Sequence, residues 1–160
     1  MKRLWAPWRM AWIAASKTPA GCVFCNARDG NDDRSTFLLA RSDHAFLILN
    51  AYPYAPGHLM AVVNRHLGAV AAAGPGELGD LMRLVQRAVE VLSAEYRPEG
   101  FNIGMNQGSV AGAGIAPHLH QHVVPRWGGD TNFMPVVART KVLPQLLRET
   151  RQLLADAWPH

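Results

Sequence analysis

Cysteine is scarce in this chain, because only Cys22 and Cys25 among its 160 residues are cysteines. Two cysteines so close together cannot supply the disulfide framework of a small secreted protein, so we expect a reducing, cytoplasmic setting. Long apolar runs are also missing, and none approaches the ~20 residues that a transmembrane helix requires. Pro7 and Arg9 interrupt the N-terminal stretch before it reaches the length of a signal peptide's apolar region. The sequence therefore predicts neither export nor membrane insertion.

Dense runs of one charge are absent as well, although the formal net charge is +4 and the sequence pI is about 9.5. This balance favours an anionic partner. The 16 lysine and arginine residues are spread along the chain, and no recognisable nucleic-acid-binding motif accompanies them. We therefore expect a small polyanionic substrate and no nucleic-acid partner.

Length and composition predict a single domain over 1–160, and no internal repeat is visible. Its first part, 1–21, carries three tryptophans at helix-like spacing, but Pro7 spoils a regular helix. We interpret this part as an irregular, Trp-rich N-terminal arm that packs through its indoles.

Hydrophobic periodicity predicts an α+β fold. Apolar positions three and four apart between Leu78 and Leu92 indicate an amphipathic helix, which follows a small, flexible stretch at 69–76. A C-terminal helix is expected over 142–158, opened by Pro144. Since the hairpins require antiparallel pairing, we expect an antiparallel sheet of about five strands, covered on one face by these two main helices. The strands are predicted at 36–41, 45–50, 58–64, 101–105 and 118–124.

Three of the seven histidines alternate in the run His118-Leu119-His120-Gln121-His122-Val123-Val124. A strand turns every second side chain to the same face, so this spacing predicts a row of three imidazoles. A neutral imidazole can either attack an electrophile or ligate a metal. The preceding loop, 106–117, contains three glycines, whose backbone N–H groups can hold phosphate oxygens or simply make the connection flexible.

The histidine run resembles the signature of the histidine-triad (HIT) superfamily of nucleotide hydrolases and transferases. A narrower resemblance, to the bacterial branch that includes diadenosine tetraphosphate phosphorylases, is also visible. In one departure, Ala113 stands where the family usually has Gln, so backbone groups of Gly112 and Gly114 are expected to replace that side chain. The superfamily resemblance is carried further by Asn106-Gln107-Gly108, Ala111-Gly112, Pro56-Gly57-His58-Leu59-Met60 and Val124-Pro125-Arg126, and the narrower one by Leu4-Trp5-Ala6-Pro7-Trp8-Arg9-Met10, Asn50-Ala51-Tyr52-Pro53-Tyr54 and the segment 125–133.

This resemblance implies that His120 is the nucleophile, which attacks the α-phosphorus of a nucleotide anhydride and forms a nucleotidyl-histidine. Water or inorganic phosphate then accepts the nucleotide, and the narrower resemblance favours phosphorolysis of a dinucleoside polyphosphate. His122 is expected to bind phosphate oxygens, while backbone amides near Gly112 and Gly114 stabilise charge in the transition state. No organic cofactor is implied, and a homodimer is expected because the superfamily commonly forms dimers.

Further substrate contacts are expected from the same resemblance. Asn50 could hydrogen-bond ribose hydroxyls, and Phe46 or Leu49 could flank a base, although both also alternate like core residues. Lys141 and Arg126 are candidate polyphosphate contacts, with a solvated surface charge as the alternative. The complete set of candidate substrate-binding residues is Phe46, Leu49, Asn50, Asn106, Gly112, Gly114, His122 and Lys141.

The resemblance assigns the remaining triad histidine, His118, to a metal. With Cys22, Cys25 and His66 it completes a Cys2His2 set, the closed four-ligand type of a structural zinc site. Members of the superfamily with a Cys-x-x-Cys pair place ligands at matching positions. A redox pair and two inert buried thiols are the alternatives for the cysteines.

Other functions stay open from the sequence. The same site could hydrolyse nucleoside phosphoramidates or other nucleotide conjugates, and a metal-dependent hydrolase could use all three triad histidines as ligands. A nucleotide-binding regulator with little turnover is a further alternative. Gln121 is expected to point to the opposite face from the triad, and His44 and His58 are assigned no catalytic role.

Overall fold

The computed structural model describes residues 21–130 and 145–159. The expected N-terminal arm, apart from Gly21, and the candidates Lys141 and Pro144 lie outside the described residues. Within those residues, no helix combines the length and the apolar character needed to cross a membrane. In chain order the elements are α2 Val23–Asp29, β1 Leu38–Arg41, β2 Ala45–Leu49, β3 Leu59–Val63, the 3-10 helix η1 Val70–Ala72, α3 Pro75–Tyr96, β4 Gly100–Gly104, β5 His120–Arg126 and α5 Leu147–Asp156.

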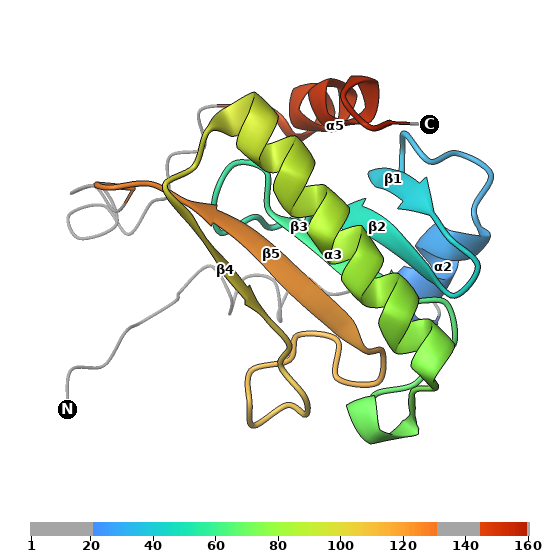
Figure 1. The fold of residues 1–160 in the computed structure, drawn as a ribbon. Coiled ribbons are helices and arrows are strands. Elements are labelled where there is room, and N and C mark those ends of the chain that lie inside the picture. The colour runs from blue at the N-terminus through green and yellow to red at the C-terminus, as the bar shows by residue number, and fades with distance from the viewer. Residues whose placement is uncertain (1–20, 131–144, 160) are drawn as a thin grey trace, which may run out of the picture.

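The five strands form one antiparallel sheet in the order β1-β2-β3-β5-β4, which confirms the predicted α+β class (Figure 1). In this order β5, which carries His120 and His122, lies between β3 and β4. The register places Val62 opposite His120 and Met60 opposite His122. The two histidines therefore lie on an interior strand, whose backbone is hydrogen-bonded to a neighbouring strand on each side.

The two faces of the sheet bury different sets of side chains because residues alternate along each strand. In β2, Leu47 and Leu49 belong to the apolar core on the side of α3, whereas Phe46 and Ile48 belong to a second cluster that includes Phe24 of α2. Helix α3 crosses the sheet over β2, β3 and β5 (Figure 1). Helix α2 therefore covers the face opposite α3.

Helix α3 is longer than the periodicity predicted. The stretch at 69–76 was expected to be flexible, but it contains η1 and the first residues of α3, because Pro75 suits the first helical position and Glu77 accepts a hydrogen bond from the N–H of Gly74 at 2.8 Å. Most of the predicted stripe is buried, but Met82 is 52% exposed and is not a core residue.

The C-terminal helix α5 begins at Leu147, whereas the prediction placed its start at 142. Residues 142–144 lie outside the described part of the chain. Leu154 is fully buried, and the Arg151 guanidinium donates to the carbonyl of Leu38 in β1 at 3.0 Å. Helix α5 thus packs beside the end of α3 and over β1 (Figure 1).

Candidate functional site

A cavity of about 730 Å³ opens on the face of the sheet that carries α2, a volume typical of small-molecule sites. Its walls come from α2, from the end of β2 and the turn that follows, and from the glycine-rich loop before β5. Two triad histidines, His120 and His122, reach it. The lining residues are Val23, Phe24, Asn26, Ala27, Thr36, Phe37, Ile48, Leu49, Asn50, Ala51, Tyr52, Tyr54, Met60, Gly112, Gly114, Ile115, His120 and His122.

His120 is prepared to act as a nucleophile by its backbone contact. Its Nδ1–H donates to the carbonyl oxygen of His118 at 2.7 Å, which leaves Nε2 without a proton. Burial lowers the pKa of His120, although the bond to this carbonyl opposes the shift, so the ring is neutral at physiological pH. A neutral imidazole with its Nε2 lone pair available is the form that nucleophilic attack requires.

His122 is held by a histidine to which the sequence assigned no role. The Nδ1 of His58 accepts the N–H of Tyr54 at 3.0 Å, so the proton of this ring lies on Nε2. That Nε2–H donates to Nδ1 of His122 at 2.9 Å, which in turn places the proton of His122 on its Nε2. In this tautomer His122 can donate a hydrogen bond from Nε2 to a phosphate oxygen.

His58 is fully buried, so its position is fixed by the core as well as by hydrogen bonds. The turn before it depends on Gly57, which has φ +74°, and a Cβ there would lie 2.8 Å from Cδ2 of Leu92. His58 and Met60 are two positions apart, so in extended chain their side chains point to the same face. Because Met60 pairs with His122, His58 and His122 lie on the same side of the sheet. This spacing is the signal by which the sequence could have indicated His58.

Asn50 lines the cavity but already has a structural task. Its Oδ1 accepts the N–H of Tyr52 at 2.9 Å, and its Nδ2 lies 3.4 Å from Nδ1 of His58. The amide thus stabilises the turn that delivers His58. Its predicted contact with a ribose stays a prediction.

The glycine-rich loop brings Gly112 and Gly114 to the cavity, whereas Asn106 is not among the lining residues. Gly112 has φ +91°, and its N–H already donates to the carbonyl of Ser109 at 3.0 Å. The N–H of Ala113 likewise donates to the carbonyl of Gly108 at 3.2 Å. Part of the amide set expected to hold phosphate therefore stabilises the loop itself.

The apolar wall differs from the one proposed from the sequence. Phe46 has no exposed surface, does not line the cavity and packs in the cluster beneath it, so the interpretation as a base contact is wrong for this residue. Leu49 lines the cavity at 2% exposure but belongs to the core on the α3 side. Ile48 and Phe24 contribute the wall instead. Phe46 and Leu49 have opposite parity on β2, so they could not share one face.

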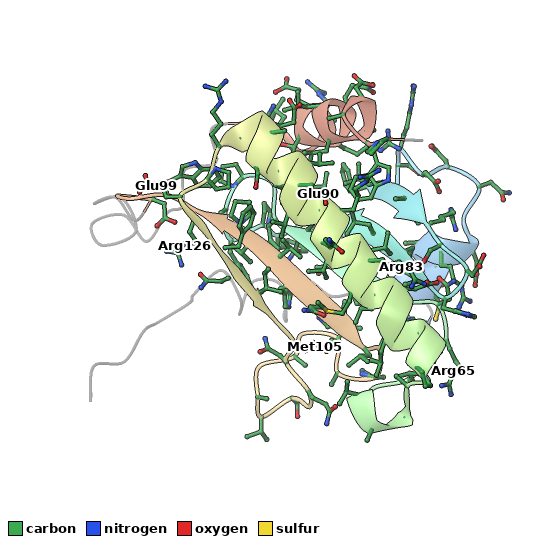
Figure 2. The ribbon with its side chains drawn as sticks, viewed as in Figure 1. Arg65, Arg83, Glu90, Glu99, Met105 and Arg126 are labelled. Carbon is green, nitrogen blue, oxygen red and sulfur yellow. The ribbon has the colours of Figure 1, made fainter. Side chains whose placement is uncertain are left out.

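Arg126 lies far from the triad end of its strand. Its guanidinium donates to the carboxylate of Asp130 at 2.5 Å and to Oδ1 of Asn102 at 2.7 Å. Figure 2 shows Arg126 and Glu99 together at the end of β4 and β5 remote from Met105. Arg126 therefore does not contact the cavity and serves as a surface ion-pair residue.

The four predicted metal ligands come together beside the cavity. Their donor atoms, in Cys22, Cys25, His66 and His118, lie within 4.8 Å of one another. The Sγ atoms of Cys22 and Cys25 lie 3.3 and 3.6 Å from Nδ1 of His118, close to the roughly 3.5 Å edge of a tetrahedron built from zinc–sulfur and zinc–nitrogen bonds. The residues therefore fit a tetrahedral ion of the size of zinc.

The surroundings of the four donors agree with metal binding. The Nε2–H of His118 donates to the carbonyl of Val63 at 2.7 Å, which leaves Nδ1 as the lone-pair atom that faces the two sulfurs. Burial and the neighbouring Cys22 raise the pKa of the Cys25 thiol, and a cation is what stabilises a pair of thiolates so close together. Because both nitrogens of His118 are committed here, His118 does not join the other triad histidines in a three-histidine metal site.

Comparison with known proteins places this arrangement in a family. The HIT domain model matches residues 31–129, which is more than half of the chain. The chain therefore belongs to the HIT domain family. A protein of Mycobacterium tuberculosis named AP-4-A phosphorylase is 42% identical over 167 residues, which cover 99% of this chain and 85% of the relative. The chain is thus an enzyme of the Ap4A phosphorylase-like branch of this family. An asymmetrical bis(5'-nucleosyl)-tetraphosphatase of Schizosaccharomyces pombe is 32% identical over 82 residues, covering 51% of this chain and 44% of the relative.

Solved structures share the fold. A zinc-bound histidine triad family protein from Mycobacterium smegmatis superimposes with a TM-score of 0.68 at 25% identity, covering 86% of this chain and 93% of that one. A hypothetical histidine triad nucleotide-binding protein from Sulfolobus tokodaii gives a TM-score of 0.67 at 22% identity, covering 85% and 91% of the two chains.

Proposed function

We propose that this enzyme cleaves dinucleoside polyphosphates such as diadenosine tetraphosphate through a covalent nucleotidyl-His120, with inorganic phosphate favoured over water as the acceptor. The observation that carries the proposal is the tautomer of His120, whose Nδ1–H is bound to the carbonyl of His118 while the ring lines the cavity. The similarity to a protein named AP-4-A phosphorylase over nearly the whole chain supports the choice of substrate and acceptor.

In the first step Nε2 of His120 forms a bond to the α-phosphorus, and the bond from this phosphorus to the oxygen that bridges to the β-phosphate breaks. The leaving group of diadenosine tetraphosphate is ATP. The positive charge that develops on the ring is stabilised by the carbonyl of His118, which accepts from Nδ1. The Nε2–H of His122 donates to the phosphate oxygens as negative charge moves onto the leaving group.

In the second step an oxygen of inorganic phosphate attacks the same phosphorus, and the bond to His120 breaks. The products are then ADP and ATP, whereas attack by water yields AMP and ATP. Splitting one displacement into two gives each step a well-placed nucleophile.

We further propose that Cys22, Cys25, His66 and His118 hold a structural zinc ion. Its contribution when bound is to folding, because it ties the start of α2 to the residues just before β5, the strand that carries His120 and His122. A homodimer and a cytoplasmic location stay predictions from the sequence.

The test is to incubate the enzyme with diadenosine tetraphosphate, with and without inorganic phosphate, and to separate the nucleotides. ADP with ATP in the presence of phosphate supports phosphorolysis, and AMP with ATP under both conditions overturns it. Acid-quenched single-turnover samples are expected to carry labelled nucleotide on His120. His120→Asn is expected to bind nucleotide without cleaving it, and full turnover by this variant contradicts the mechanism.

A further inference from the structure

The cavity extends past the triad histidines on both sides, and the ring contacts define its direction. The ring of Phe24 lies 5.0 Å from that of His120, His120 lies 5.0 Å from His122, and His122 lies 5.9 Å from Tyr54, all between centroids. The two histidines therefore stand between an apolar end at α2 and an aromatic end at the turn after β2.

The aromatic end consists of Tyr52 and Tyr54, which are 61% and 47% exposed although both line the cavity. Their backbone is held firmly. The N–H of Tyr52 donates to Oδ1 of Asn50, the N–H of Tyr54 donates to Nδ1 of His58, and Pro53 between them has a restricted φ. Two large, partly exposed aromatic rings thus line this end of the cavity. Because their backbone is already ordered, it loses little conformational entropy when a ligand binds.

The charges of the residues that line the cavity indicate which part of a substrate this aromatic end can bind. Among the described residues that line it, none is a lysine or an arginine. Within the described part of the chain, a bare polyphosphate tail leaving the histidines would meet aromatic surface there and no cation. A nucleobase, by contrast, stacks on an aromatic ring whatever its identity, since every base has a π-face.

We infer that Tyr52 and Tyr54 form a subsite for the second nucleoside of the substrate, the one that departs with the leaving group, and that its base stacks on these rings. This inference rests on the proposed function, because it assigns α2 and the apolar end to the nucleoside that becomes attached to His120. It predicts that the two tyrosines give the enzyme a preference for a dinucleotide over a mononucleotide with the same phosphate chain.

Tyr52 is the better residue for a test, because Tyr54 also packs on His58 at 4.5 Å and on His122. The measured quantity is the ratio of kcat/KM for diadenosine tetraphosphate to kcat/KM for adenosine 5'-tetraphosphate, which has the same anhydride chain but no second nucleoside. For Tyr52→Ala we expect this ratio to fall roughly 5- to 150-fold, the range that corresponds to stacking of one base. Tyr52→Phe is expected to keep the wild-type ratio, and so is the matched control Met82→Ala, an exposed apolar residue on α3.

The variants separate the outcomes. An unchanged ratio in Tyr52→Ala overturns the subsite, and an equal fall in Tyr52→Phe and Tyr52→Ala overturns stacking in favour of a hydroxyl contact. Calorimetric binding of the same two nucleotides to His120→Asn and to His120→Asn with Tyr52→Ala repeats the comparison without turnover. If the wild-type enzyme cleaves neither nucleotide, the proposed function fails, and the binding ratio still decides the subsite.

Discussion

The contact between His58 and His122 makes a prediction that the triad motif alone does not. His58 accepts the N–H of Tyr54 with one ring nitrogen and donates to His122 with the other, at 3.0 and 2.9 Å. Asn at position 58 can keep the first of these bonds but is too short for the second, whereas Gln can place an N–H nearer the former Nε2. We therefore compare His58→Asn with His58→Gln.

The size of the effect follows from burial. His58 has no exposed surface, so in His58→Asn the Nδ1 of His122 loses its donor in a site that water fills poorly. A buried polar group left without its partner costs about 1–3 kcal/mol. If His122 also changes tautomer, its Nε2 no longer carries the proton that faces phosphate. We expect kcat/KM for diadenosine tetraphosphate to fall roughly 5- to 150-fold in His58→Asn, and less in His58→Gln.

The assay is steady-state cleavage followed by nucleotide separation, with thermal unfolding of each variant to show that the protein is folded. His44→Asn is the matched control, because His44 is exposed and does not line the cavity. Wild-type kcat/KM in a folded His58→Asn protein would refute the reasoning, since it would mean that His122 needs no partner to hold its tautomer.

Three further predictions concern stability and the metal. Gln121, as expected, faces away from the cavity, and its buried Oε1 has no hydrogen-bond partner among residues 21–130 and 145–159. Gln121→Met is therefore expected to raise the free energy of unfolding by about 1 kcal/mol in urea titrations, and a loss would contradict this. Arg65 lowers the pKa of Glu77 to about 2, with help from the N–H of Gly74. Glu77 therefore stabilises the fold above pH ~4.5, and this contribution disappears as the pH falls towards 2. Because Arg65 is 58% exposed and water screens the pair, Glu77→Gln is expected to lower the free energy of unfolding by about 1 kcal/mol at pH 7 and by nothing near pH 2. Urea titrations at both pH values will measure this difference. An equal loss at both would exclude a contribution that depends on the ionisation of Glu77. Finally, elemental analysis of protein prepared without chelator is expected to find one zinc per chain in the wild type and none in Cys25→Ser. The variant is also expected to bind AMP more weakly, because the metal holds α2 in place and α2 carries Phe24 in the cavity wall. Wild-type protein without zinc would remove the metal proposal.

The alternation of His120 and His122 was enough to predict that both rings lie on one face of β5, because the period of a strand is two whatever surrounds it. The strand was expected to begin at His118, but His118 lies before β5. The same local rule predicted the orientation of Gln121. It could not predict which residue of one face reaches the cavity. Phe46 and Ile48 lie on the same face of β2, but Phe24 of α2 packs on Phe46, and Ile48 lines the cavity instead.

The sequence by itself determined the class of fold and the triad, since both depend on residue type and short spacing. The set of four candidate metal ligands came instead from the family resemblance, because Cys22 and His118 are 96 positions apart. Only the tertiary structure decided that His118 turns to the cysteines while its carbonyl holds His120, and that His58 holds His122 across 64 positions of sequence. The physical reason is that a tautomer is set by the partner of the other ring nitrogen, and that partner is chosen by how distant strands pair and what lies buried between them.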